Sequence, residues 1–181
     1  MAWKKNKLEL FLRLDSEYYE IVKFIIENPE FIKRKEYVHH ESCSVFDHCL
    51  AVSVLSYLWS KKLGLDYKSA AIGGLLHDFY DKPWQSKDHK AVKENGKMFW
   101  QKHGFVHARE AVNNAYLYFP EFMNNKIDNI IRRHMFPLNV VPPKYSEAWV
   151  VTMVDKYVSM DVFKSPREWP KYLGLSRKKN V

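Results

Sequence analysis

Helical periodicity runs through most of the chain and constrains its fold more than any other feature. Apolar residues recur at steps of three and four, which is the spacing of one face of an α-helix. Glycine is scarce, and Asn95-Gly96, the one typical hairpin turn, is flanked by polar residues rather than by a strand pattern. We therefore predict an all-α fold, with helices near 6–27, 44–63, 67–78, 105–118, 124–135 and 146–163.

Local signals place the ends of these helices. Asn28 precedes a proline and so avoids helical dihedrals, which predicts that the first helix ends there. Ser44 suits the N-cap of the second helix, and Gly64 suits its C-terminal end. Prolines predict a loop over 136–145, and the polar segment 81–104 predicts a long connection or a short helix.

The length of 181 residues predicts a single domain over 1–181. The net charge of +8 is concentrated near the termini, because residues 1–13 carry +3 and residues 171–181 carry +4. A nucleic-acid groove needs basic side chains clustered on one face of the fold, so nucleic acid is not the partner that we expect.

No apolar run approaches the ~18 residues of a membrane span, and no secretory signal is visible. We therefore expect a cytoplasmic protein without a membrane partner, and a homo-oligomer remains open. Cys43 and Cys49 are expected to be reduced thiols.

Polar residues interrupt the apolar faces of all the predicted helices after the first. His48, for example, lies in the stripe formed by Val45, Val52 and Leu55. Buried charge is costly unless it is paired or coordinates a metal, and no matching set of Lys or Arg falls on these faces. Imidazole and carboxylate ligands suit Fe, Mn, Zn or Co, whereas soft-metal sites need thiolates. The interrupting residues are His48, His77, Asp78, His107, His134 and Asp155.

His77 and Asp78 are adjacent in the sequence, which restricts how they can bind metal. Neighbouring residues on a helix point about 100° apart, so both can reach one metal only where they flank it, as at a helix end. A carboxylate has two oxygens, so Asp78 can bridge two metals while His77 binds one of them. This predicts a site for two metal ions.

The order of these residues resembles the HD-domain metal-dependent phosphohydrolase superfamily. The resemblance rests on His48, on His77-Asp78 within GGLLHDFYDKPW and on Asp155 within VTMVDKYVS, and it covers about residues 38–163. It implies an HD-domain helical bundle with the metal site between the central helices.

Two further histidines, His107 in HAREAVNNA and His134 in IIRRHMFPL, resemble the binuclear branch of that superfamily. We prefer His107 to His103 as a ligand, because the family's third ligand is typically followed four residues later by a small residue, here Ala111. The resemblance implies two divalent metal ions, with Fe as the first expectation and Mn, Zn, Co or Mg as alternatives. The implied ligands are His48, His77, Asp78 and Asp155 for one ion, and Asp78, His107 and His134 for the other.

The resemblance also implies a function, hydrolysis of a nucleotide or other small phosphate ester through a metal-bound hydroxide. Asp78 would then be catalytic as well as a ligand, and Lys82, Arg133 and Lys156 are candidates for binding the phosphate. Many members have Lys three residues after the HD aspartate, whereas this chain has Asp81 followed by Lys82. Two alternatives remain, a di-iron oxygenase with the same ligand set and a regulatory or binding module with weak nucleic-acid affinity.

Overall fold

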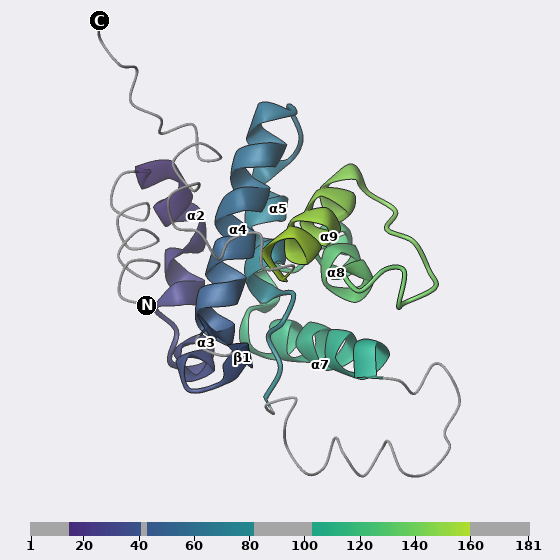
Figure 1. Cartoon of the computed structure of the whole chain (residues 1–181). Helices are drawn as coiled ribbons and strands as arrows, with labels where there is room; N and C mark the ends of the chain where they lie inside the picture. Colours follow the sequence, from purple (N-terminus) through teal and green to yellow (C-terminus); the bar gives the residue numbers. More distant parts are fainter. Residues whose placement is uncertain (1–14, 41–42, 82–102, 160–181) are drawn as a thin grey trace, which may run out of the picture.

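The structure, a computed structural model, describes residues 15–40, 43–81 and 103–159. These residues form a helical fold (Figure 1), as predicted. In chain order the elements are α2 (Ser16–Ile26), α3 (Pro29–Ile32), the 3-10 helix η1 (Lys33–Lys35), β1 (Val38–His40), β2 (Cys43–Ser44), α4 (Val45–Lys62), α5 (Tyr67–Leu76), α7 (His103–Tyr118), the 3-10 helix η3 (Pro120–Phe122), α8 (Asn125–Arg133) and α9 (Ser146–Ser159).

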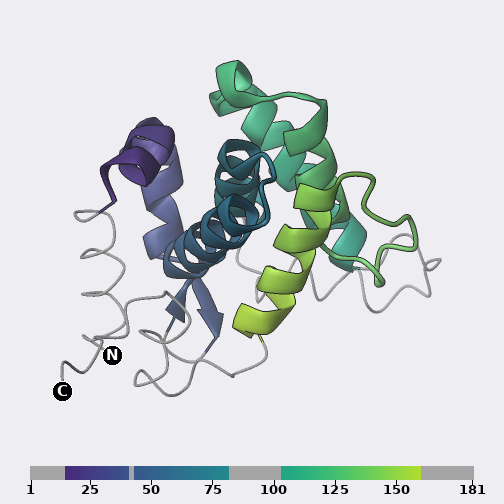
Figure 2. The ribbon, with the colours of Figure 1, turned by 90° about the horizontal axis from the view of Figure 1, so that it is seen from above.

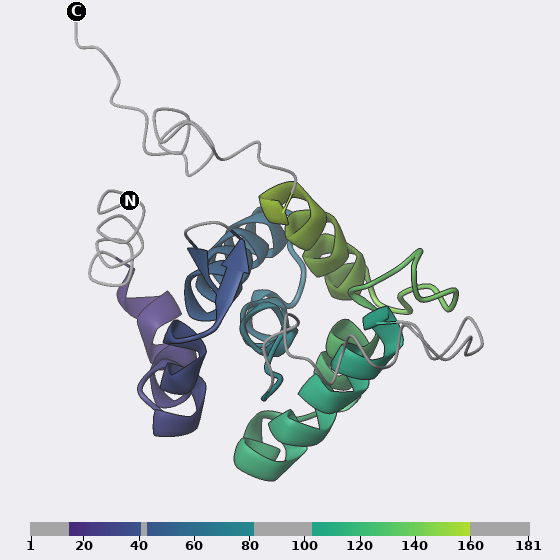
Figure 3. The same cartoon turned by 60° about the horizontal axis from the view of Figure 1, so that its bottom comes forward.

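Helix α5 lies at the centre of this arrangement. Figure 3 shows it end-on, with the other helices around it. It packs against α4, α8, α9 and α2, and every residue from Ser69 to Leu76 is buried. α4 lies beside α5 (Figure 2), and most of its residues are buried. The buried face of α4 is therefore wider than the single apolar stripe seen in the sequence.

Two glycines allow α5 to approach its neighbours closely. A Cβ atom at Gly73 would lie 2.6 Å from Cγ2 of Ile130 on α8. A Cβ atom at Gly74 would lie 3.1 Å from the Cα atom of Ser53 on α4. The Ser53 hydroxyl donates to the carbonyl of Ala71 at 2.7 Å, which ties the same two helices together. The absence of side chains at 73 and 74 therefore sets the depth at which the end of α5 lies in the core.

Several predicted boundaries are confirmed. The Ser44 hydroxyl accepts a hydrogen bond from the backbone N–H of Asp47 at 3.1 Å and so caps α4. Gly64 has φ of 69°, a left-handed conformation that favours glycine, just beyond the end of α4. The first helix ends before Asn28, whose side chain then caps α3. Residues 136–145 form the predicted loop.

Other boundaries differ from the prediction. The helix expected over 67–78 ends at Leu76, and that expected over 124–135 ends at Arg133. β1 and β2 form a short antiparallel pairing that the sequence did not suggest. Residues 1–14, 82–102 and 160–181, which include the basic termini, lie outside the described residues. In the part of the chain that the structure describes, no helix is long and apolar enough to cross a membrane.

We predict that Gly74→Ala destabilises the protein although alanine is the better helix former. Helix propensity alone would favour alanine by about 0.5–1 kcal/mol. The contact with the Ser53 backbone should outweigh this gain, because overpacking a core costs about 1–3 kcal/mol. Urea unfolding with a metal chelator present measures the difference. The control is Lys68→Ala at an exposed position of α5, which should stay within about 0.5 kcal/mol of the parent. A more stable Gly74→Ala variant would contradict the close packing of α4 and α5.

Candidate metal centre

The predicted ligands approach one another from five helices or from the residues just after them. Two of them lie within helices α4 and α7, and a third lies on α9. The others lie at or directly after the C-terminal ends of α5 and α8. In chain order they are His48 on α4, His77 and Asp78 after α5, His107 on α7, His134 after α8 and Asp155 on α9.

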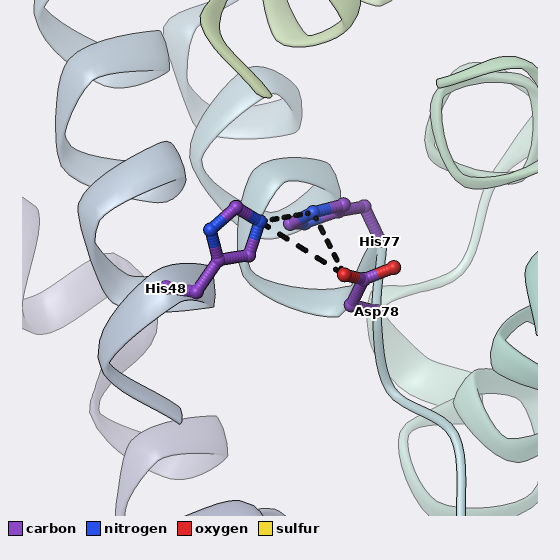
Figure 4. Close-up of side chains that lie close together, drawn as sticks. All are labelled: His48, His77 and Asp78. Atoms are coloured by element: carbon purple, nitrogen blue, oxygen red, sulfur yellow. Dashed lines mark hydrogen bonds and ion pairs between the residues drawn. The ribbon is translucent and has the colours of Figure 1, made fainter. Parts of the chain in front are cut away.

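The first group forms around the end of α5. Nε2 of His48 lies 3.2 Å from Nε2 of His77, and Figure 4 shows both rings directed toward the carboxylate of Asp78. Oδ1 of Asp155 lies 3.2 Å from Nε2 of His48 and 3.5 Å from Nε2 of His77. The four side chains therefore converge as the sequence predicted, and all of them are buried.

The second group forms on the other side of Asp78. Nε2 of His107 lies 3.3 Å from Nε2 of His134. His134 is buried, whereas His107 is partly exposed. His103 begins α7, and its side chain lies outside the described residues, so the choice of His107 over His103 stays a prediction.

Asp78 belongs to both groups, and each of its oxygens faces a different one. Oδ2 lies 3.6 Å from Nε2 of His77 and 3.9 Å from Nε2 of His48. Oδ1 lies 3.4 Å from Nε2 of His107 and 3.5 Å from Nε2 of His134. Within each trio of Asp78 and two histidines, the candidate ligand atoms lie within 4.8 Å of one another. Asp78 thus offers one carboxylate oxygen to each group of histidines.

Backbone carbonyls fix the orientation of two of these rings. Nδ1 of His77 donates to the carbonyl of Gly74 at 2.8 Å, and Nδ1 of His134 donates to the carbonyl of Ile131 at 2.7 Å. A carbonyl oxygen only accepts, so in each ring Nδ1 carries the hydrogen and Nε2 is directed toward the carboxylates. Metal-binding histidines typically donate their second N–H to a carbonyl or carboxylate in this way. His77 and His134 are also the residues directly after the C-terminal ends of α5 and α8.

The electrostatics of the cluster favour a positive charge at its centre. Burial lowers the pKa of His77, but the carboxylates of Asp78 and Asp155 outweigh it and raise that pKa to about 9. Burial would raise the pKa of Asp155, but hydrogen bonds from His48 and His77 hold it well below its usual range. Burial is also the main reason that the pKa of His134 is lowered. The carboxylates thus stabilise a cation beside Nε2 of His77, which a proton or a metal ion can supply.

The donor set fits divalent metals of intermediate hardness. Four imidazoles and two carboxylates suit Fe, Mn, Zn or Co, and the described side chains of the cluster include no thiolate ligand. Cys49 is buried nearby, and burial raises the pKa of its thiol well above the usual value, so it stays protonated. The chemistry of the cluster is therefore compatible with two bound ions.

The predicted phosphate-binding residues have different surroundings. Lys156 is half-buried on α9, and its Nζ donates to the carbonyl of His134 at 3.2 Å. Burial lowers the pKa of Lys156, and Asp155 opposes this. Arg133 is half-buried at the end of α8, directly before His134. Lys82 lies outside the described residues.

Sequence reasoning missed three buried residues around the centre. The Tyr80 ring packs edge-on against His107, with 5.8 Å between the ring centroids. Asn114 donates to the carbonyl of Phe79 at 3.1 Å. Arg34 is completely buried although it lies in the basic run KRK, which gave no sign of burial. Asn114 could have been found, because it lies seven residues, or two helical turns, after His107.

Comparison with known families agrees with this geometry. The family model of the HD domain matches residues 45–160, which include all the predicted ligands. The chain belongs to the HD-domain family. Membership implies divalent metal binding, and the two groups around Asp78 are the candidate ligands. Neither the curated proteins nor the solved structures gave a match to this chain.

We predict that the ligand variants lose metal in a pattern set by the position of Asp78. Asp78→Ala should lose both ions, because its carboxylate faces both groups. His134→Ala should lose one ion and keep the other, because Nε2 of His134 faces Oδ1 of that carboxylate, the oxygen directed toward the second group. Elemental analysis of the purified proteins should give about two ions per chain for the parent, about one for His134→Ala and close to none for Asp78→Ala.

The control for this pattern is a histidine that lies outside the predicted ligand set. His103→Ala should keep both ions, whereas His107→Ala should behave like His134→Ala. Circular dichroism must first show the helix content of the parent, because metal loss can also follow unfolding. Two ions in a folded Asp78→Ala variant would refute the bridging position.

Proposed function

We propose that the protein is a metal-dependent phosphohydrolase that acts on a nucleotide or another small phosphate ester. One observation carries the proposal: the two oxygens of Asp78 face two different histidine groups at 3.4–3.9 Å. A carboxylate shared in this way is suited to hold two cations close together. The HD-domain family supports the reaction class.

Six side chains of the centre would bind the two ions. His48, His77 and Asp155 would hold one ion and His107 and His134 the other, with Asp78 shared. We propose Fe as the first candidate, with Mn, Zn, Co or Mg as alternatives. When bound, two divalent ions supply an activated water and stabilise charge on a phosphoryl group.

The charges of the chain's own residues suit an anionic substrate. Asp78 and Asp155 balance only half of the charge of two divalent ions, which leaves a positive surplus for a phosphate ester. We assign Arg133 to binding the phosphate, because it directly precedes His134 and is only half-buried. Lys156 would add positive charge beside the second group while its Nζ holds the His134 carbonyl.

The assay for this proposal starts from metal-free protein. Fe²⁺, Mn²⁺ or Co²⁺ is added back, and release of inorganic phosphate is measured from nucleoside monophosphates and sugar phosphates. We expect phosphate release only after metal is restored. Asp78→Asn, which keeps the shape of the side chain and removes its charge, should remain at the level of the metal-free protein.

The matched control is Asp128→Asn, which changes a carboxylate that pairs with Arg132 on the surface of α8. It should keep the activity of the parent. Oxygen consumption with a mixed-valent iron signal and no phosphate release would instead identify an oxygenase. Metal binding without either activity, together with salt-dependent nucleic-acid binding, would identify a binding module.

A further inference from the structure

The chain immediately after the metal ligands is held by a buried arginine. Arg34 is fully buried, and its guanidinium donates to Oδ1 of Asp81 at 2.7 Å and to the carbonyl of Glu30 at 2.9 Å. Its guanidinium carbon lies 4.3 Å from the centroid of the Phe79 ring. A buried charge stays beside its partner, because separating the two would leave an unpaired ion in apolar surroundings. Arg34 therefore fixes Phe79 and Asp81, which follow Asp78 in the sequence.

The same segment is held from the opposite side by α7. Nδ2 of Asn114 donates to Oδ2 of Asp81 at 3.0 Å and to the carbonyl of Phe79 at 3.1 Å. The backbone N–H of Asp81 donates to the carboxylate of Glu110 at 3.3 Å. Asp81 thus connects η1 to α7 through its two oxygens. We call Arg34, Asp81 and Asn114 the Asp81 clamp.

One member of the clamp, Asn114, lies on α7, the helix that also carries His107 of the second group. Asn114 follows His107 by two helical turns, so both project from the same face of α7. In Figure 1 the chain leaves α5 and descends between α3 and α7. His48 and Asp155 lie on α4 and α9, which pack directly against α5 and against each other. The first group therefore has support that does not pass through α7.

We propose that Arg34 is a positioning residue that acts through Asp81 and Asn114 to set the distance of His107 from Asp78. The clamp would then control binding of the second metal ion and leave the first ion to the packing of α4, α5 and α9. This inference rests on the proposed two-metal site. In this proposal Asp81 positions α7 and does not bind substrate.

Two variants open the clamp in different places. Arg34→Met removes the guanidinium and keeps most of the side-chain volume. The Asp81 side chain is already half exposed, so water can solvate its charge in this variant. Asn114→Ala removes the α7 side of the clamp and keeps the pair of Arg34 and Asp81. The control is Lys33→Met, which removes an exposed lysine that pairs with Glu30 in the neighbouring turn.

The first measurement is calorimetric binding of Mn²⁺ to each full-length chain. Both clamp variants should weaken the affinity for the second ion by about 10–100-fold and leave the affinity for the first ion unchanged. Residues that hydrogen-bond to metal ligands have effects of this size. Lys33→Met should bind both ions as the parent does. An equal loss at both sites in a folded clamp variant, or no loss at either, would overturn the proposal.

The second measurement uses hydrogen exchange of the metal-free proteins and does not depend on metal. Both clamp variants should exchange the amides of α7 faster and those of α4 at the parent rate. Unchanged exchange in α7 would overturn the clamp even if the parent binds two ions. A parent that binds fewer than two ions, with faster exchange in α7 of the variants, would refute the two-metal function and retain the clamp.

Discussion

The carboxylate of Asp78 is buried between two pairs of histidines, and the arrangement of the helices follows from that position. An ionised carboxylate in a protein interior costs several kcal/mol unless positive charge or hydrogen-bond donors surround it. Oδ2 meets His48 and His77, and Oδ1 meets the other pair. Each pair combines one histidine within a helix with one at a helix end. The core must therefore bring four helices to one carboxylate, and α9 adds Asp155 to the first pair.

The ends of two helices provide the rigidity that this centre needs. His77 and His134 each donate Nδ1 to the carbonyl three residues earlier, so the geometry of the last turn sets the direction of Nε2. The end of α5 is in turn held deep in the core by the close contacts of Gly73 and Gly74. Backbone packing and ligand orientation are thus parts of one arrangement, in which a small displacement of α5 moves both metal groups.

The sequence predicted the helical fold and the side chains that cluster around Asp78 for a clear physical reason. A histidine or aspartate on an apolar face, such as His48 between Val45 and Val52, conflicts with burial unless it has a function or a partner. Arg34 could not be found in this way, because it lies in an irregular basic segment and its partner Asp81 is distant in the sequence. The β1–β2 pairing is too short to show an alternating pattern. Lys82 remains a prediction, as it lies outside the described residues.

Anomalous X-ray diffraction from crystals grown with Mn²⁺ would test the central claim most directly, because it locates each ion without reference to activity. The account predicts two anomalous peaks on opposite sides of the Asp78 carboxylate. One peak should lie beside Nε2 of His48 and His77, and the other beside Nε2 of His107 and His134. A single peak in the first group, or two peaks of which one lies away from Asp78, would contradict a carboxylate shared by two ions.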